Sequence, residues 1–280
     1  MLALVDRTPN PPDTSFEHNH TSLKGTGITP SLDQEDEPTR NGQRGQREFH
    51  RPAGDEDDSA EETVVLVHGL WLGSWVMGLM GKRLRRCGFQ SAFFSYPSMS
   101  SSLSENASLL ARFTAGIISS RLHFIGHSLG GLLILQMLDE FPQPRLGRVI
   151  LAGSPYTACS VGRKLSRRGP GRYILGRSML QWLDRLDEAA ATRNPPYEFG
   201  VIAGCRSVGA GRLITRLPGP NDGVVTVEET RVPNARDEIV LNVGHSEMLV
   251  STELVRQACT FLRHGHFLHM QEQGQRERRF

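Results

Sequence analysis

The chain has 280 residues, 38% of them hydrophobic and 22% charged, and its formal net charge at pH 7 is +2. No apolar run reaches the roughly 18 residues of a membrane-spanning helix, and Met1–Val5 is followed at once by charged Asp6 and Arg7, unlike a secretory signal. We therefore expect no spanning helix and a cytoplasmic location.

The first 62 residues differ in composition from the remainder. They hold 14 acidic and 6 basic side chains, about −8 net, whereas the other 218 residues hold 26 basic and 16 acidic, about +10. This segment carries few apolar residues with a regular period, so it cannot bury enough apolar surface to offset the entropy of ordering it. We interpret residues 1–62 as a disordered acidic and polar tail, either an interaction segment or a dispensable extension.

Four cysteines are widely spaced and form no pair of the kind that binds structural zinc: Cys87, Cys159, Cys205 and Cys259. Free thiols in a reducing compartment are the simplest expectation.

From residue 63 onward, short apolar runs alternate with helical patterns. Strands are predicted over residues 63–67, 91–95, 121–125, 148–152, 199–203 and 238–243. Helices are predicted over residues 74–86, 104–118 (with Ser104 as its N-cap), 128–139 and 252–263. Uninterrupted apolar strands between amphipathic helices predict an α/β fold, with a mainly parallel sheet of about six strands covered by helices on both faces.

Residues 154–196 interrupt this alternation. The segment is basic, and one stretch, Tyr173–Leu186, has apolar side chains at helical spacing. An insertion at this point lies above the carboxyl ends of the strands, so it is predicted to act as a lid; an ordinary surface helix on the sheet edge is the alternative.

The most informative stretch is Phe124–Leu132, in which a buried strand, a glycine-flanked turn and a helix follow one another. Gly126 and Gly130 keep side chains away from the point where the strand and helix backbones come close. Ser128 can then occupy a strained corner with its Oγ exposed, which is the arrangement of a nucleophile elbow.

A serine hydroxyl needs a base, and a histidine base needs a carboxylate to hold its tautomer. His245 follows the last apolar strand in Gly244-His245-Ser246 and is our candidate base. Asp222, in the turn Gly219–Val225, is the candidate acid. Asp184, Asp187 and Asp237 are the alternative acids, while His123 and His127 are predicted to be structural and His264, His266 and His269 to be poor candidates for base or metal ligand.

The attack would generate an oxyanion that needs preorganised donors. The backbone amide of Leu129, which follows the serine, is one candidate. The amide of Leu70 in the loop after the first strand is the other, with Gly69 as a close alternative. His68 is predicted to brace that loop. Trp71 is a candidate to line an acyl pocket, whereas Trp75 either does the same or packs the following helix.

Together these residues resemble the α/β-hydrolase superfamily: the strand into His68-Gly69-Leu70, the turn Gly126–Gly131, Asp222-Gly223-Val224-Val225, and Gly244-His245. They are most similar to compact bacterial lipases and carboxylesterases and to inositol-deacylase-like relatives. The resemblance covers residues 63–263. It implies hydrolysis of esters or lipid esters without a metal or cofactor.

The resemblance also sets boundaries. We expect an α/β-hydrolase domain at residues 63–265, with residues 154–196 as its lid-like insertion, and a polar C-terminal tail at residues 266–280. The two antiparallel strands with which many members begin are missing, so a minimal core of six strands is expected. A His-Gly-Gly-Gly loop is also missing, which disfavours bulky tertiary-alcohol esters.

The leading hypothesis is a serine hydrolase that cleaves carboxylic esters through an acyl-enzyme on Ser128, His245 and Asp222. A thioesterase, an amidase or an acyltransferase would use the same residues. The alternative from another class is a non-catalytic binding protein that uses the basic core to contact a partner or an anionic membrane. The expected partner is a small-molecule or lipid ester. Nucleic-acid binding is not supported, because the arginines are not interleaved with aromatic residues.

Overall fold

The computed structural model describes residues 61–188, 197–208, 214 and 216–269. The tail predicted over residues 1–62 therefore lies outside the described residues, apart from Glu61 and Glu62, and the end of the C-terminal tail lies outside them as well.

The sheet matches the architecture predicted from the apolar runs. Its six strands are all paired in parallel, in the order β2-β1-β3-β4-β5-β6. They are β1 (Glu62–Val67), β2 (Gln90–Phe94), β3 (Arg121–His127), β4 (Leu146–Ala152), β5 (Phe199–Gly204) and β6 (Asp237–Leu241). Each predicted strand is confirmed to within a few residues at its ends.

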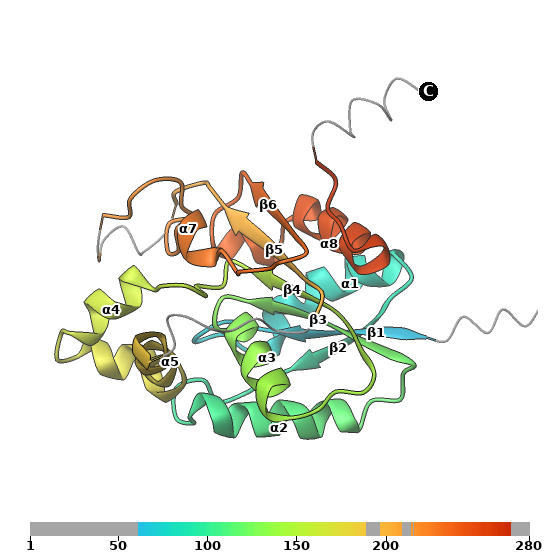
Figure 1. Cartoon of the computed structure of the whole chain (residues 1–280), viewed down its shortest axis with the longest axis horizontal. Coiled ribbons are helices and arrows are strands. Elements are labelled where there is room, and N and C mark those ends of the chain that lie inside the picture. Colours follow the sequence, from blue (N-terminus) through green and yellow to red (C-terminus); the bar gives the residue numbers. More distant parts are fainter. Residues whose placement is uncertain (1–60, 189–196, 209–213, 215, 270–280) are drawn as a thin grey trace, which may run out of the picture. The chain divides into compact units, whose positions relative to one another are not determined.

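Both faces of the sheet are covered, which explains why inner strands such as β1 and β5 have no polar alternation. Val65 and Val67 point into a core shared with α2 (Leu103–Ala115) and α3 (Leu129–Glu140). Val64 and Leu66 point into a second core with α1 (Gly78–Arg86) and α8 (Thr252–His264). The two helix pairs lie on opposite faces of the sheet in Figure 1.

Two helix starts differ from the expectations. The helix predicted over residues 74–86 begins as a 3-10 turn, η1 (Ser74–Met77), before α1. Ser102, and not Ser104, is the N-cap of α2, because its hydroxyl accepts the Glu105 amide while the Glu105 carboxylate accepts the Ser102 amide. Such a capping box outcompetes the neighbouring serine, so the predicted cap was wrong.

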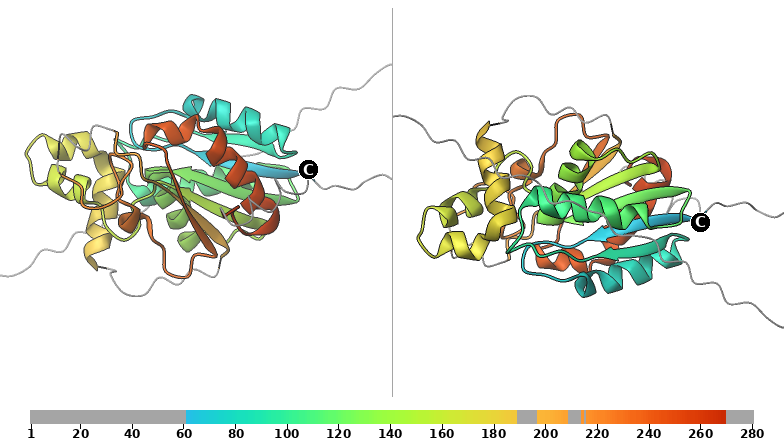
Figure 2. Two further views of the ribbon diagram at one scale, coloured as in Figure 1. Left: turned by 90° about the horizontal axis from the view of Figure 1, so that it is seen from above. Right: turned by 90° about the horizontal axis from the view of Figure 1, so that it is seen from below.

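The described part of the insertion consists of helices beyond the carboxyl ends of the strands (Figure 2). The predicted amphipathic stretch lies within α5 (Gly171–Glu188), which is interrupted at Gly176, where φ is 68° and ψ is 173°. A shorter helix, α4 (Ser160–Ser166), precedes it and was not predicted. Two turns are too short to show a clear period in the sequence.

The expectation of free thiols is wrong for two of the four cysteines. Cys87, just after α1, and Cys259, in α8, form a disulfide that joins positions 172 residues apart. Their spacing gave no signal for it, because the sheet fold brings α1 and α8 together. Cys159 and Cys205 are free. The cysteines therefore give no support for a cytoplasmic location.

Between β5 and α8, the chain forms the short helix α7 (Val227–Thr230) before β6 and the 3-10 turn η2 (Ser246–Leu249) after it. Within the described residues, no helix has both the length and the apolar character needed to span a bilayer.

Candidate active site

Ser128 occupies the sharp turn between β3 and α3. Its φ of 54° and ψ of −123° place it in a region that residues other than glycine rarely adopt. Neither neighbouring glycine tolerates a side chain: a Cβ on Gly126 would lie 2.4 Å from the Gly131 backbone, and one on Gly130 would lie 2.3 Å from the Val67 carbonyl oxygen. The glycines therefore allow the strained turn that presents Ser128, as the spacing of the motif predicted.

Asp222 lies in the turn after β5, and it is fixed by backbone donors. Its Oδ1 accepts the amides of Val224 and Val225 at 2.9 and 2.7 Å. The amide of Asp222 itself donates to the Val225 carbonyl oxygen at 3.0 Å. The side chain is 1% exposed, and these bonds leave Oδ2 free to face the next loop.

His245 completes a buried pair with this aspartate. Its Nδ1 lies 2.7 Å from Asp222 Oδ2, and its backbone amide donates to the Asp222 carbonyl oxygen at 2.9 Å. Because a carboxylate only accepts, Nδ1 carries the proton and Nε2 is left as the basic nitrogen. The structure thus brings together the two residues that the sequence placed 23 positions apart.

His127 and the segment at Ala152 and Gly153 hold Asp222 and His245 close to the turn at Ser128. His127, which precedes Ser128, has its Nε2 3.0 Å from the His245 carbonyl oxygen, and the two rings are 4.7 Å apart. The Ser128 amide donates to the Ala152 carbonyl oxygen at 2.9 Å. The next residue, Gly153, has a φ of 59°, and a Cβ there would lie 3.2 Å from Asp222 Oδ2.

Sequence reasoning did not single out Gly153. It directly follows β4, which pairs with β3, the strand that leads to Ser128. A Cβ on it would also lie 3.0 Å from Met248 Sδ and 3.3 Å from His245 Nδ1. A glycine directly after a buried strand was the available signal, but glycine is frequent in this chain and that position alone is not specific.

The loop after β1 packs against the serine. A Cβ on Gly69 would lie 3.1 Å from Ser128 Cβ. Among the described residues, the amides of Leu70 and Leu129 have no protein acceptor, and the Leu129 amide is at the N-terminus of α3. One predicted donor thus lies in the loop that packs against Ser128, and the other lies at the helix start that follows it.

His68 braces this loop as expected. Its Nδ1 contacts the Gly69 carbonyl oxygen at 2.8 Å, and its own carbonyl accepts the Tyr96 hydroxyl at 2.9 Å. The rings of His68 and Tyr96 are stacked. Burial lowers the pKa of His68, so the imidazole stays neutral.

His127 is also held neutral. Burial, and secondarily the neighbouring His245, lowers the pKa of His127 to about 3. The neutral ring then donates from Nε2 to the His245 carbonyl, which accepts. His127 thus has a structural role, as predicted: it fixes the backbone of His245, the candidate base.

The two tryptophans of the first loop differ in their contacts. Trp71 is 60% exposed, and its indole donates to the Ile174 carbonyl oxygen of α5 at 2.7 Å. Trp75 is 82% exposed, so neither role expected for it, lining a pocket or packing the following helix, is supported. Of the two tryptophans, Trp71 is thus the one with a hydrogen bond to the described part of the insertion.

The remaining histidines lie elsewhere. His123 is fully buried in β3, where its Nδ1 accepts the Arg148 amide at 2.9 Å. His269 contacts Asp237 at 3.0 Å, a carboxylate neighbour that the sequence did not indicate. Within the described residues, no cluster of three or more histidine, cysteine or acidic side chains could hold a metal ion.

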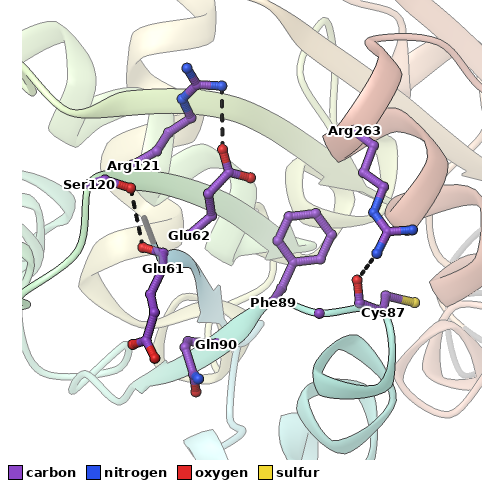
Figure 3. Close-up of a pocket in the computed structure, with 9 residues that line it drawn as sticks. Glu61, Glu62, Cys87, Phe89, Gln90, Ser120, Arg121 and Arg263 are labelled. Carbon is purple, nitrogen blue, oxygen red and sulfur yellow. Dashed lines mark hydrogen bonds and ion pairs between the residues drawn. The ribbon is translucent and has the colours of Figure 1, made fainter. Parts of the chain in front are cut away.

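A separate hollow of about 680 Å³ lies at the amino ends of β1, β2 and β3, the end opposite Ser128. Figure 3 shows its lining, where Arg121 pairs with Glu62 and Arg263 reaches the Cys87 carbonyl beside Phe89. Its lining contains none of the candidate site residues.

Comparison with known proteins agrees with the fold. Residues 64–276 match the model of the Alpha/beta hydrolase family. A parallel sheet with a strand, serine and helix at its carboxyl edge defines this class of protein, and the chain belongs to the alpha/beta hydrolase family.

Solved structures share the fold at low identity. A mature lipase from Bacillus licheniformis is 20% identical with a TM-score of 0.52, and the match covers 73% of this chain and 90% of that one. A metagenomic carboxyl esterase is 17% identical with a TM-score of 0.54, covering 70% and 68%. An esterase from Exiguobacterium antarcticum is 13% identical with a TM-score of 0.50, covering 73% and 92%. No curated protein matches the chain.

Proposed function

We propose that the protein is a serine hydrolase that cleaves carboxylic esters, including lipid esters, through an acyl-enzyme on Ser128. Structural neighbours named as lipases and esterases support an ester substrate. The observation that carries the proposal is the buried contact of 2.7 Å between Asp222 and His245, beside a serine in a strained turn.

The reaction would proceed in two halves. Ser128 Oγ attacks the ester carbonyl carbon while His245 Nε2 takes the hydroxyl proton, and Asp222 stabilises the imidazolium through Nδ1. The amides of Leu70 and Leu129 donate to the oxyanion. Collapse breaks the bond to the alcohol, which leaves with the proton from His245. Water then attacks the acyl-enzyme, again losing its proton to His245, and the proton returns to Ser128 as the acid leaves.

The test is hydrolysis of p-nitrophenyl esters, from acetate to palmitate, by the full chain and by Ser128→Ala. We expect kcat/KM to fall by roughly a thousandfold or more in the variant, with its thermal unfolding unchanged. Ser108→Ala in α2 is the matched control and keeps full activity. A stable wild-type protein without turnover on any ester, and without labelling by a fluorophosphonate, would refute the proposal.

We further propose that the insertion makes peripheral contact with an anionic membrane. Arg167, Arg168 and Arg172 are exposed between and at the start of helices α4 and α5, beside Tyr173, which is 85% exposed. No acidic residue occurs between Ser154 and Leu183. Arginines with an exposed tyrosine suit a negatively charged lipid surface.

Vesicle sedimentation tests this contact. The full chain should bind vesicles that contain phosphatidylserine at low salt and release them at high salt, because screening shortens the reach of the charges. Replacing Arg167, Arg168 and Arg172 by glutamate should abolish binding. The matched control replaces Lys82, Arg85 and Arg86, which are exposed on α1, by glutamate and should retain most of it. Equal loss of binding in both triple variants would show that binding depends on the net charge of the protein and not on the insertion, and would contradict the proposed contact.

A cytoplasmic location stays a prediction without support from free thiols.

A further inference from the structure

Trp71 adopts a backbone conformation that a large side chain avoids. Its φ is 63°, in the left-handed region, and it directly follows Leu70. Such a conformation costs about 1–3 kcal/mol and persists only where other contacts maintain it. The indole is nevertheless 60% exposed, so burial is not its main support.

A hydrogen bond to α5 maintains this conformation of Trp71. The indole Nε1–H donates to the Ile174 carbonyl oxygen at 2.7 Å. In an uninterrupted helix this carbonyl would accept the amide four residues further on, at Ser178. Gly176 breaks the helix between them, with a φ of 68° and a ψ of 173°, and this makes the carbonyl available to the indole.

The two parts of α5 have different anchors. Beyond the break, the Arg177 amide donates to the Met99 carbonyl oxygen at 3.0 Å, and the Ser178 hydroxyl donates to the Ser101 carbonyl oxygen at 2.8 Å. Gly176 itself lies against the chain at Met99, where a Cβ would come within 2.6 Å of Met99 Cα. The long part of α5 is therefore fixed to the segment before α2, whereas Trp71 links the first turn, residues 171–175, to the loop beside Ser128.

We propose that Trp71 is a specificity-determining positioning residue, whose indole N–H holds the first turn of α5 against the Leu70 loop and so limits the acyl chains that the site accepts. This inference rests on the proposed ester hydrolysis. Without the indole N–H, the exposed residues Arg172–Ile174 lose their bond to the Leu70 loop and can shift beside the break at Gly176. The site then admits longer acyl groups, while the serine and its partners are untouched.

The closing experiment compares Trp71→Phe with the matched control Trp75→Phe. Phenylalanine keeps an aromatic ring and removes the donor. For Trp71→Phe we expect the ratio of kcat/KM for octanoate over acetate to rise at least about fivefold, mainly through KM for octanoate. Trp75→Phe, which removes an exposed indole from the next turn, should leave that ratio unchanged. An unchanged ratio in Trp71→Phe would overturn the inference.

A second readout does not depend on activity. Arg172 is an exposed trypsin site within the first turn of α5. Trypsin should cleave after Arg172 at least about threefold faster in Trp71→Phe than in the wild type or in Trp75→Phe, because local opening admits the protease. Equal cleavage rates in well-folded proteins would refute the positioning role. If the wild type hydrolysed no ester but cleavage still accelerated, the proposed function would fail while the coupling between Trp71 and α5 stood.

Discussion

His127 and His245 are joined by a hydrogen bond in which the buried His127 Nε2–H donates to the main-chain carbonyl oxygen of His245, at 3.0 Å. The residue before the candidate nucleophile thus holds the backbone of the candidate base. Burial lowers the pKa of His127 to about 3, so the ring is neutral when it makes this contact.

That pKa predicts acid sensitivity. Between the ordinary histidine pKa of about 6.5 and about 3, the unfolded chain binds a proton at His127 and the folded protein does not. The stability that neutral His127 contributes is therefore complete above pH 6.5 and is lost as the pH falls. The free energy of unfolding should drop by up to about 1.4 kcal/mol per pH unit for this residue.

Urea denaturation at several pH values measures the slope. His127→Gln keeps an amide donor but does not titrate, so its slope should be shallower than that of the wild type. Buried His68 and His123, whose pKa values are also lowered by burial, should leave a residual slope. Identical slopes in the two proteins would contradict the assignment.

Asp222→Asn should separate orientation from folding. An amide in place of the carboxylate can donate to His245 Nδ1 and so favours the tautomer with its proton on Nε2, which cannot accept the serine proton. We expect kcat for p-nitrophenyl acetate to fall by about 10³–10⁴, with little change in thermal unfolding. Asp184→Asn on α5 is the control for an alternative acid. A larger loss of kcat in Asp184→Asn than in Asp222→Asn would show that the acid of the site is Asp184, in the insertion.

Gly130→Ala should be strongly destabilising. Its Cβ would lie 2.3 Å from the Val67 carbonyl oxygen and 2.5 Å from that of His68, and backbone atoms cannot move aside as a side chain can. We expect a loss of about 3 kcal/mol or more, or failure to fold. Gly78→Ala in α1 is the contrast, because nothing lies within 4 Å of its Cβ position and its φ is −58°. It should be neutral or stabilise by up to about 1 kcal/mol in thermal denaturation.

Reduction of the disulfide between Cys87 and Cys259 should lower stability. Cross-linking positions 172 residues apart restricts the unfolded chain, which is worth about 2–4 kcal/mol in typical proteins. Thiol titration under denaturing conditions should give two thiols before reduction and four after it. Chemical denaturation of Cys87→Ser should show the loss of stability, and Cys205→Ser should not. Four thiols in the untreated protein would show that the bond does not form.

The sheet was predictable because its inner strands contain continuous apolar runs, a pattern that burial on both faces imposes, and the edge strands β2 and β6 still end in apolar residues. The turn at Ser128 was predictable for a local reason, since Gly126 and Gly130 are required within one short segment. Asp222 and His245 could be proposed from their places after strands, but only the fold shows their contact.

The features that the sequence did not indicate depend on distant contacts. Gly153, the disulfide and the bond from Trp71 to Ile174 each join segments whose proximity follows from the sheet order. The capping of α2 by Ser102 was missed for a different reason: several serines lie together there, and a side-chain hydrogen bond selects one of them.

The described domain begins with β1 and ends after α8, and both of these ends lie at the amino edge of the sheet, away from α4 and α5 (Figure 1, Figure 2). A tether attached at either end would therefore hold the protein by the amino edge of the sheet, the edge opposite Ser128. Immobilised on a support through residues next to β1 or α8, the protein would present the face that carries Ser128 to the solution, so attachment at either of these two places should preserve the proposed hydrolysis equally.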